Sequence, residues 1–227
     1  MMQALPLLIV NRRCTGQNKG SIMPESSITL YGMNLSGHCH RVELLLRMLN
    51  LSFRYETVSP ADRTSPRFLA LNPLAQIPVL TDGNLVLADS NAILVYLALR
   101  YDSARTWYPG DPVIAARIQR WLSVAAGEIR FGPAMARVIR IFSRPGDLAA
   151  AQQIAARVLP FMDAHLADRS FLAHEAPTIA DLACYSYVAH APEGAIPLEP
   201  YSHIRAWLAR IEALPGFTPM PRSELSS

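Results

Sequence analysis

The hydrophobic pattern of this sequence changes at a break rich in proline and glycine. Residues 109–112 read Pro-Gly-Asp-Pro, and such a stretch cannot continue a helix. Before the break, short alternating segments are interleaved with helical ones. After it, the chain is rich in Ala, Arg and Leu at helical spacing as far as about Leu214. Because 227 residues are enough for two domains of roughly 100–200 residues, we expect an α/β domain followed by an all-helical one.

The first domain is predicted over residues 27–104, with the element order βαβαββα. Strands are expected at 28–31, 53–58, 77–80 and 85–87, and helices after Ser36, over 65–71 and over 90–101. The dipeptide Asp82-Gly83 favours a hairpin turn, because it supplies the positive φ angles that a tight turn needs. Ser90 is expected to cap the last of these helices with its side-chain oxygen.

The rest of the chain is divided by the same signals. We expect an irregular N-terminal tail at 1–26 and a linker at 105–110. The helical domain is predicted at 111–214 and a C-terminal tail at 215–227. Asp111 followed by Pro112 is a typical helix start. Thr178 and Asp181 are spaced as a capping box, which indicates a structural role for both residues.

Composition excludes several function classes. The net charge of +3 comes from scattered basic residues, which argues against a nucleic-acid partner. Lys19 is the only lysine, so Schiff-base chemistry is not expected. Cys14, Cys39 and Cys184 are too few and too widely spaced for a disulfide framework or a zinc site. The apolar run at 5–10 is short and lacks a preceding positive charge, and no stretch approaches the ~20 apolar residues of a membrane span. We expect a cytoplasmic protein without a metal or a membrane partner.

Three features are predicted to form one pocket: Ser36 at a helix start, Pro78 before a strand, and Asp89-Ser90 at another helix start. A proline in this position is a candidate for a cis peptide bond and has a structural role. It would leave the backbone N–H and C=O of Ile77 available to an extended peptide ligand. The two helix N-termini present free N–H groups that favour anions. One of them suits a thiolate and the other a carboxylate.

The sequence strings at 30–32, 36–39, 71–80 and 89–93 resemble, in that order, those of the cytosolic glutathione S-transferases, as does Pro-Thr-Ile-Ala-Asp-Leu-Ala at 177–183. The likeness runs from about residue 27 to 214 and favours the serine-type, theta- or nu-like members. It implies a thioredoxin-like domain followed by a helical bundle. It also implies an enzyme that uses glutathione as co-substrate, without a further cofactor, against a small electrophile or disulfide. A homodimer with a role in detoxification is the corresponding expectation.

The resemblance assigns roles to individual residues. Ser36 would be the catalytic serine, whose hydroxyl donates a hydrogen bond to the thiolate. A free thiol has a pKa of roughly 8.5, and both such a hydrogen bond and a helix N-terminus lower it. The backbone of Ile77 would pair with the cysteine of glutathione. Ser90 would hold the γ-glutamyl carboxylate and Asp89 its amino group, while Gln76 would lie near the glycine end or the peptide backbone.

Other residues have more than one interpretation. Cys39 is either a redox or catalytic thiol, as in thioredoxin-like enzymes, or a small residue packed on the sheet. Because Ser36 occupies the partner position, Cys39 cannot form an intramolecular dithiol relay. His38 either takes part in substrate binding, by assisting Ser36 or contacting the thiolate, or is a partly solvated loop residue. Four residues of the first long helix in the second domain either line the electrophile pocket or form a solvated face: Arg130, Phe131, Arg137 and Arg140.

Two alternative functions remain at this point. One is a noncatalytic binding or regulatory module of the same fold. The other is a glutathione-dependent disulfide reductase or peroxidase, because the same thiolate could perform that chemistry.

Overall fold

The computed structural model describes residues 27–223, and the chain outside them includes the predicted N-terminal tail. The strands are β1 (Ile28–Gly32), β2 (Arg54–Thr57), β3 (Val79–Asp82) and β4 (Leu85–Ala88). The helices are α1 (Gly37–Met48), α2 (Pro66–Leu71), α3 (Ser90–Tyr101), α4 (Pro112–Val124), α5 (Met135–Phe142), α6 (Leu148–His165), α7 (Ile179–Ala189) and α8 (Ser202–Glu212). Short 3₁₀ helices lie at Asp62–Thr64 and Ala191–Gly194, and a π-helical segment at Ala125–Ala134. In this described part, no helix is both long and apolar enough to cross a bilayer.

The N-terminal domain contains a four-stranded sheet in the order β2-β1-β3-β4. β2 runs parallel to β1, whereas β3 is antiparallel to both β1 and β4. The predicted βαβαββα order is therefore confirmed, and the fold is thioredoxin-like. The hairpin turn begins one residue later than the Asp82-Gly83 pattern predicted. Asp82 is the last residue of β3, and Gly83 alone of the pair has a positive φ, of 56°.

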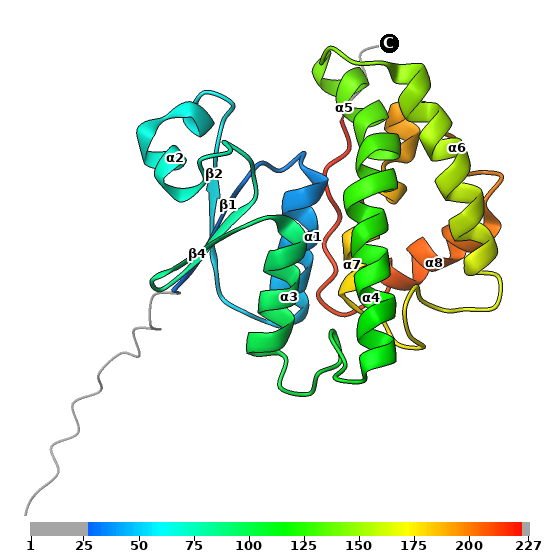
Figure 1. The fold of residues 1–227 in the computed structure, drawn as a ribbon, viewed down its shortest axis with the longest axis horizontal. Coiled ribbons are helices and arrows are strands. Elements are labelled where there is room, and N and C mark those ends of the chain that lie inside the picture. Colours follow the sequence, from blue (N-terminus) through cyan, green and yellow to red (C-terminus); the bar gives the residue numbers. More distant parts are fainter. Residues whose placement is uncertain (1–26, 224–227) are drawn as a thin grey trace, which may run out of the picture.

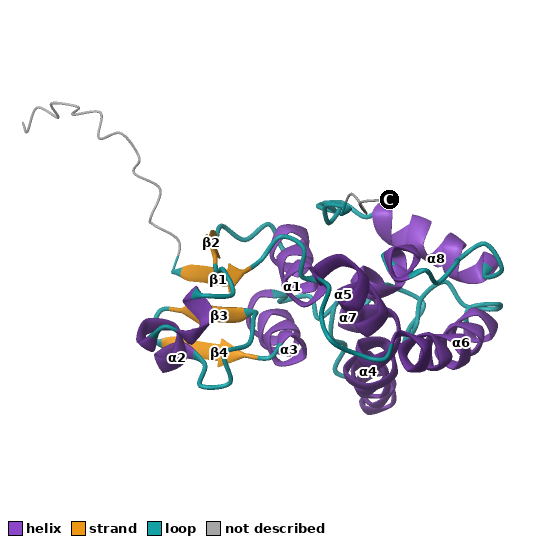
Figure 2. Cartoon of the chain, turned by 90° about the horizontal axis from the view of Figure 1, so that it is seen from above, coloured by secondary structure: helices purple, strands orange, loops and turns teal. Residues whose placement is uncertain are grey.

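Helices cover the sheet on both faces (Figures 1 and 2). α1 and α3 lie between the sheet and the helical domain, and Leu30 of β1 belongs to the main core on that side. On the other face, Tyr31 joins Phe68 of α2 in a smaller apolar cluster. All of β1 is buried, because its alternating side chains meet a helix layer on either face.

The two domains are joined mainly through α7. Of its 11 residues, every one from Ile179 to Val188 is buried, as expected of a helix packed on all sides. It contacts α1 and α3 of the first domain and α4 of the second. The predicted capping box is present at its start: the backbone N–H of Thr178 donates to Asp181 Oδ2 at 2.9 Å. The other oxygen of Asp181 accepts from the Trp207 indole at 2.9 Å, which ties α7 to α8.

The run from α4 to α5 is helical, as predicted, but its middle is a π-helix, which the sequence analysis did not anticipate. Pro133 lies within this segment and has no N–H to donate to the preceding turn. Gly132 allows close packing on α6, since a Cβ at this position would lie 3.0 Å from the backbone nitrogen of Ala155. π-Helical turns are rare and occur frequently at functional sites.

The chain after α8 returns along α1 (Figure 1, red). The carbonyl oxygen of Thr218 accepts from His40 Nε2 at 2.8 Å, and the backbone N–H of Ser223 donates to Glu193 Oε1 at 3.2 Å. Gly216, with a φ of 81°, lets the chain pass α1 closely. The described part of the predicted C-terminal tail is therefore packed against both domains.

Candidate functional site

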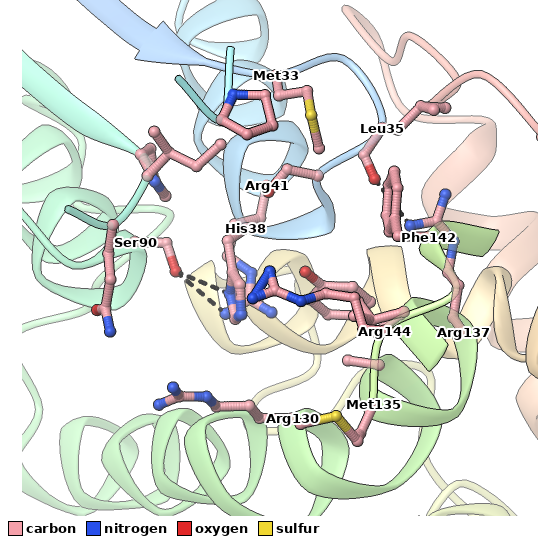
Figure 3. A pocket seen from close by; sticks show the side chains of 18 of the residues that line it. Met33, Leu35, His38, Arg41, Ser90, Arg130, Met135, Arg137, Phe142 and Arg144 are labelled. Atoms are coloured by element: carbon pink, nitrogen blue, oxygen red, sulfur yellow. Dashed lines mark hydrogen bonds between the residues drawn. The ribbon is translucent and has the colours of Figure 1, made fainter. Parts of the chain in front are cut away.

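A cavity of about 850 Å³ lies between the two domains and is lined by residues of both (Figure 3). All the candidate catalytic and binding residues line it, as does Pro78, which was predicted to be structural: Ser36, His38, Gln76, Ile77, Asp89, Ser90 and Pro78. The helical domain contributes lining residues from α5, from the π-helical segment that precedes it and from the loop that follows it.

Ser36 is the N-cap of α1. It has the extended backbone of a cap residue, and its Oγ accepts a hydrogen bond from the backbone N–H of Cys39 at 3.4 Å. A hydroxyl that accepts a hydrogen bond can still donate its own proton. Gly37 is required next to it, because a Cβ there would lie 2.8 Å from the ring of Tyr187. The cap and this close packing fix the position of the Ser36 hydroxyl at the cavity.

The Ile77–Pro78 peptide bond is cis, as predicted. The ladders with β1 and β4 begin at Val79, so Ile77 lies outside both of them. The preceding loop is held by Asn72, a buried residue whose Nδ2 donates to the carbonyl oxygen of Gln76 at 2.9 Å. Ile77 therefore lies at the cavity on a loop that Asn72 holds in place.

The start of α3 differs from the prediction. Its N-cap is Asp89, whose Oδ1 accepts from the backbone N–H groups of Asn91 and Ala92 at 2.9 and 3.0 Å. Ser90 is the first helical residue, and its buried hydroxyl is not used as a cap. Asp and Ser are equally good N-cap residues, so sequence alone does not rank them. Asp89 also has a φ of 73°, a sparsely populated conformation for a residue other than glycine.

Ser90 lies beside a buried arginine. Arg41, from α1, points Nη1 toward Ser90 Oγ at 3.4 Å and Asn91 Oδ1 at 3.0 Å. Its Nε and Nη2 are buried and have no hydrogen-bond partner among the described residues. Burial lowers the pKa of this guanidinium, yet arginine stays charged at any physiological pH. The floor of the cavity therefore carries a positive charge with unused donors.

His38 belongs to α1, which excludes the interpretation as a loop residue. Its Nδ1 lies 3.4 Å from Ser90 Oγ, and its ring meets that of Tyr187 edge-on at 4.9 Å between centroids (Figure 3). Burial holds the pKa of His38 well below its usual value, and the charges of Arg41 and Arg130 lower it further. The imidazole is therefore neutral at pH 7 and adjoins Ser90.

Cys39 is buried, with 1% of its surface exposed. Burial raises its thiol pKa to about 11, so the thiol is protonated at neutral pH. Its Sγ packs against β1, 2.8 Å from where a Cβ of Gly32 would be. The structure thus supports the packing interpretation and contradicts the nucleophilic one.

Within residues 27–223, no three His, Cys, Asp or Glu side chains are grouped so as to hold a metal ion.

The arginines of the cavity were either not identified from the sequence or given two alternative interpretations. Arg130 and Arg137 line the cavity, whereas Phe131 and Arg140 do not. Three further arginines line it without having been singled out: Arg41, Arg63 and Arg144. A signal existed only for Arg41, which lies on the buried side of α1, three and four residues before buried leucines.

The fold and the cavity define a two-domain protein of the thioredoxin-like class, in which two helix N-termini and a cis-proline loop meet at one cavity. Comparison with known proteins agrees. Family models for the glutathione S-transferase N-terminal domain and the glutathione S-transferase C-terminal domain match residues 30–105 and 130–215.

Individual relatives match most of the chain. Glutathione S-transferase 3 from Zea mays is 35% identical over 209 residues, which cover 84% of this chain and 91% of the relative. Glutathione S-transferase theta-2 from Homo sapiens is 32% identical over 181 residues, or 73% of this chain and 72% of the relative.

Solved structures show the same likeness. A glutathione S-transferase from Pseudomonas fluorescens has a TM-score of 0.80 at 30% identity, covering 86% of this chain and 99% of that one. A theta class glutathione S-transferase from Xanthomonas axonopodis pv. citri, with glutathione bound, has a TM-score of 0.78 at 27% identity, covering 89% and 100%. The chain belongs to the glutathione S-transferase family, which confirms the family, the fold class and the transferase class predicted from the sequence.

Proposed function

We propose that this protein binds glutathione in the interdomain cavity, activates its sulfur as a thiolate and transfers it to a small electrophile or disulfide. The observation that carries this proposal is that one cavity unites the hydroxyl of Ser36, the backbone of Ile77 and the N-terminus of α3 at Asp89-Ser90. These groups match the thiol, the peptide backbone and the γ-glutamyl end of glutathione.

In this arrangement the γ-glutamyl group lies at the start of α3. The hydroxyl and the backbone N–H of Ser90 hold its carboxylate, because the next three N–H groups of the helix already donate to Asp89. The positive charge of Arg41 beneath Ser90 favours the anion. Asp89 holds the amino group through the carboxylate oxygen that does not cap the helix. His38 supports the same subsite through its contact with Ser90, and Gln76 lies toward the glycine end.

The sulfur is placed next to Ser36 at the N-terminus of α1. Donation of the Ser36 hydroxyl proton to the thiolate, together with the helix dipole, lowers the thiol pKa below the value of roughly 8.5 for a free thiol. The thiolate then attacks the electrophile, a bond from sulfur to the electrophilic atom forms, and the leaving group departs with its electron pair. The protein contributes orientation, pKa lowering and exclusion of water, without a covalent bond to itself.

A relay through a protein thiol is not supported, since Cys39 is buried and protonated. Reduction of a disulfide would therefore depend on the glutathione thiolate itself. The residues expected of a glutathione site are all present at the cavity, which also argues against a module that has lost glutathione binding.

The proposal extends to assembly and location. A homodimer is supported by exposed apolar side chains on β4, α3 and α4, namely Val86, Leu99 and Val113. Sedimentation equilibrium would test it, and a monomer at micromolar concentration would contradict it. A cytoplasmic location is supported by Cys39 and Cys184, which form no disulfide within residues 27–223 and so fit a reducing compartment. A role in detoxification follows from the family likeness.

The decisive experiment combines retention on immobilised glutathione with turnover of a chlorodinitrobenzene and of a mixed disulfide. A charge-assisted hydrogen bond contributes about 1.5–3 kcal/mol, so Ser36→Ala should lower kcat/KM about 10- to 100-fold near neutral pH. The loss should shrink at high pH, where the thiol ionises without help.

The matched control is Ser65→Ala, which removes the serine N-cap of α2, a residue outside the cavity lining. It should leave the pH profile unchanged. If Ser36→Ala leaves the pH dependence of turnover unchanged, the role of Ser36 is wrong. Retention without turnover would favour the binding module.

A further inference from the structure

The cavity has an unbalanced charge. Among the described residues that line it, five are arginines: Arg41, Arg63, Arg130, Arg137 and Arg144. The one carboxylate in the same lining is Asp89, and one of its oxygens already caps α3.

Arg137 alone of these arginines has an acidic partner within the described chain. Its Nε lies 2.5 Å from Glu193 Oε2, and both side chains are largely buried. Arg41, Arg63, Arg130 and Arg144 form no ion pair with a described residue. Uncompensated charges of one sign around a concave site raise the local concentration of oppositely charged ligands. The cavity therefore favours a second substrate that is negatively charged over one that is neutral.

The four arginines without an ion pair fall into two groups according to the domain they come from. Arg41 and Arg63 belong to the N-terminal domain, on the side of Ser36 and Ser90, where the proposed glutathione groove lies. The positive charges of Arg41 and Arg63 would attract the two carboxylates of glutathione. Arg130 and Arg144 come from the helical domain, and Figure 3 shows Arg130 across the cavity from Ser90. If glutathione occupies the groove of the N-terminal domain, Arg130 and Arg144 border the part of the cavity that it leaves for the second substrate.

Apart from Arg137, which is paired with Glu193, and Ser143, the rest of this second part of the cavity is apolar. Arg130 and Arg144 are accompanied in the lining by Ala134, Met135, Val138, Phe142 and Pro145. The charge of Arg130 also lowers the pKa of His38, after burial and the charge of Arg41. An apolar wall beside two unpaired guanidinium groups matches an apolar body that carries an anion.

We propose that the preferred electrophile of this enzyme is an apolar, aromatic-sized molecule bearing a carboxylate, which Arg130 and Arg144 hold while the glutathione thiolate attacks. This rests on the function proposed above. With a nitro-activated aryl chloride, a bond from sulfur to carbon forms, the carbon–chlorine bond breaks and chloride leaves with the electron pair. The thiol proton passes to solvent, and the carboxylate is unchanged by the reaction.

The test compares a chloronitrobenzoate with its methyl ester, which has the same ring and leaving group but no negative charge. The kcat/KM of each is divided by its uncatalysed rate constant with glutathione, which removes the difference in intrinsic reactivity. We expect the normalised value to favour the carboxylate by about tenfold at low ionic strength. The preference should fall as salt is added, because Arg130 and Arg144 are exposed and their charges are screened.

Arg130→Gln and Arg144→Gln should each lower the carboxylate-to-ester ratio severalfold, and the double variant should bring it close to one. The matched control is Arg140→Gln, an exposed arginine of α5 outside the cavity lining, which should keep the wild-type ratio.

Turnover of the ester with no preference for the carboxylate would overturn the inference and leave the proposed function standing. An equal loss on both electrophiles in the Arg130 and Arg144 variants would also overturn it. If glutathione neither binds nor reacts with either compound, the proposed function fails, and the inference fails with it.

Discussion

Arg137 of the helical domain donates a hydrogen bond from Nη1 to the carbonyl oxygen of Leu35 at 2.7 Å. Leu35 precedes Ser36, so the helical domain directly holds the loop that carries the proposed catalytic hydroxyl. The other side of the Arg137 guanidinium pairs with Glu193. Glu193 also accepts from His190 and from the backbone of Ser223, so the loop before α1 is connected through Arg137 and Glu193 to the end of α7 and to the C-terminal segment.

Arg137→Lys tests this positioning role. Lysine keeps the charge beside Glu193 but cannot bridge Glu193 and Leu35 with a planar fork. We expect kcat to fall about tenfold with little change in the KM for glutathione, and the pH profile to shift upward, because the Ser36 hydroxyl is less well placed. Arg140→Lys, on the exposed side of the same helix, is the control. A change confined to thermal stability would show that Arg137 is only structural.

Cys39 is expected to be dispensable for the chemistry. Its thiol is buried and its pKa is raised to about 11 by that burial, so alkylation at pH 8 should be slow in the native protein and fast in urea. Cys39→Ala should keep kcat/KM near that of the wild type. Peptide mapping by mass spectrometry measures the labelling. Rapid native alkylation of Cys39, or loss of turnover in a folded Cys39→Ala variant, would contradict this prediction.

His40 makes stability depend on pH. Burial lowers its pKa from the ordinary 6.5 to about 4, so the unfolded chain takes up this proton at a higher pH than the folded protein does. Stability should therefore be lost as the pH falls from about 6.5 to about 4. His40 alone contributes a loss of about 2 kcal/mol at pH 5.

Urea denaturation at pH 7 and pH 5 measures this difference. His40→Gln should start less stable and lose less on acidification, whereas the exposed His203→Gln should behave as the wild type. His38 and His190 also have lowered pKa values, so some pH dependence should remain in the variant. An unchanged slope in His40→Gln would contradict the assignment.

Asp181 should be important for folding and not for catalysis. It accepts hydrogen bonds from the backbone of Leu172 and Thr178 and from the Trp207 indole, all of them buried. Asp181→Ala leaves these donors without a partner, at about 1–3 kcal/mol each, so we expect a loss above about 3 kcal/mol. Urea midpoints report it, with exposed Glu128→Gln as the control. A small loss would mean that water replaces the carboxylate.

The local fold was largely readable from the sequence, since strand alternation, helical spacing and cap residues act over a few neighbours. The βαβαββα order, the cis peptide at Pro78 and the capping box at Thr178 all follow from such signals. The start of α3 was assigned to the wrong residue, because Asp89 and Ser90 compete as caps and tertiary packing around Arg41 selects between them.

Features that depend on distant partners were not readable. The π-helical segment arises where Gly132 meets α6, and the arginine lining is brought together from separate parts of the chain. The course of residues 215–223 depends on His40 and Glu193, each far away in sequence. The sequence pattern within one helix or strand does not predict contacts with residues far away in the chain.

The central claim is that the cavity holds glutathione with its sulfur ionised beside Ser36. Ultraviolet difference absorption of the enzyme–glutathione complex, recorded while the pH is raised, follows ionisation of the bound sulfur directly. The account predicts a midpoint well below the value of roughly 8.5 for a free thiol, moving back toward it in Ser36→Ala. A midpoint equal to that of free glutathione, or the absence of any saturable signal, would contradict it.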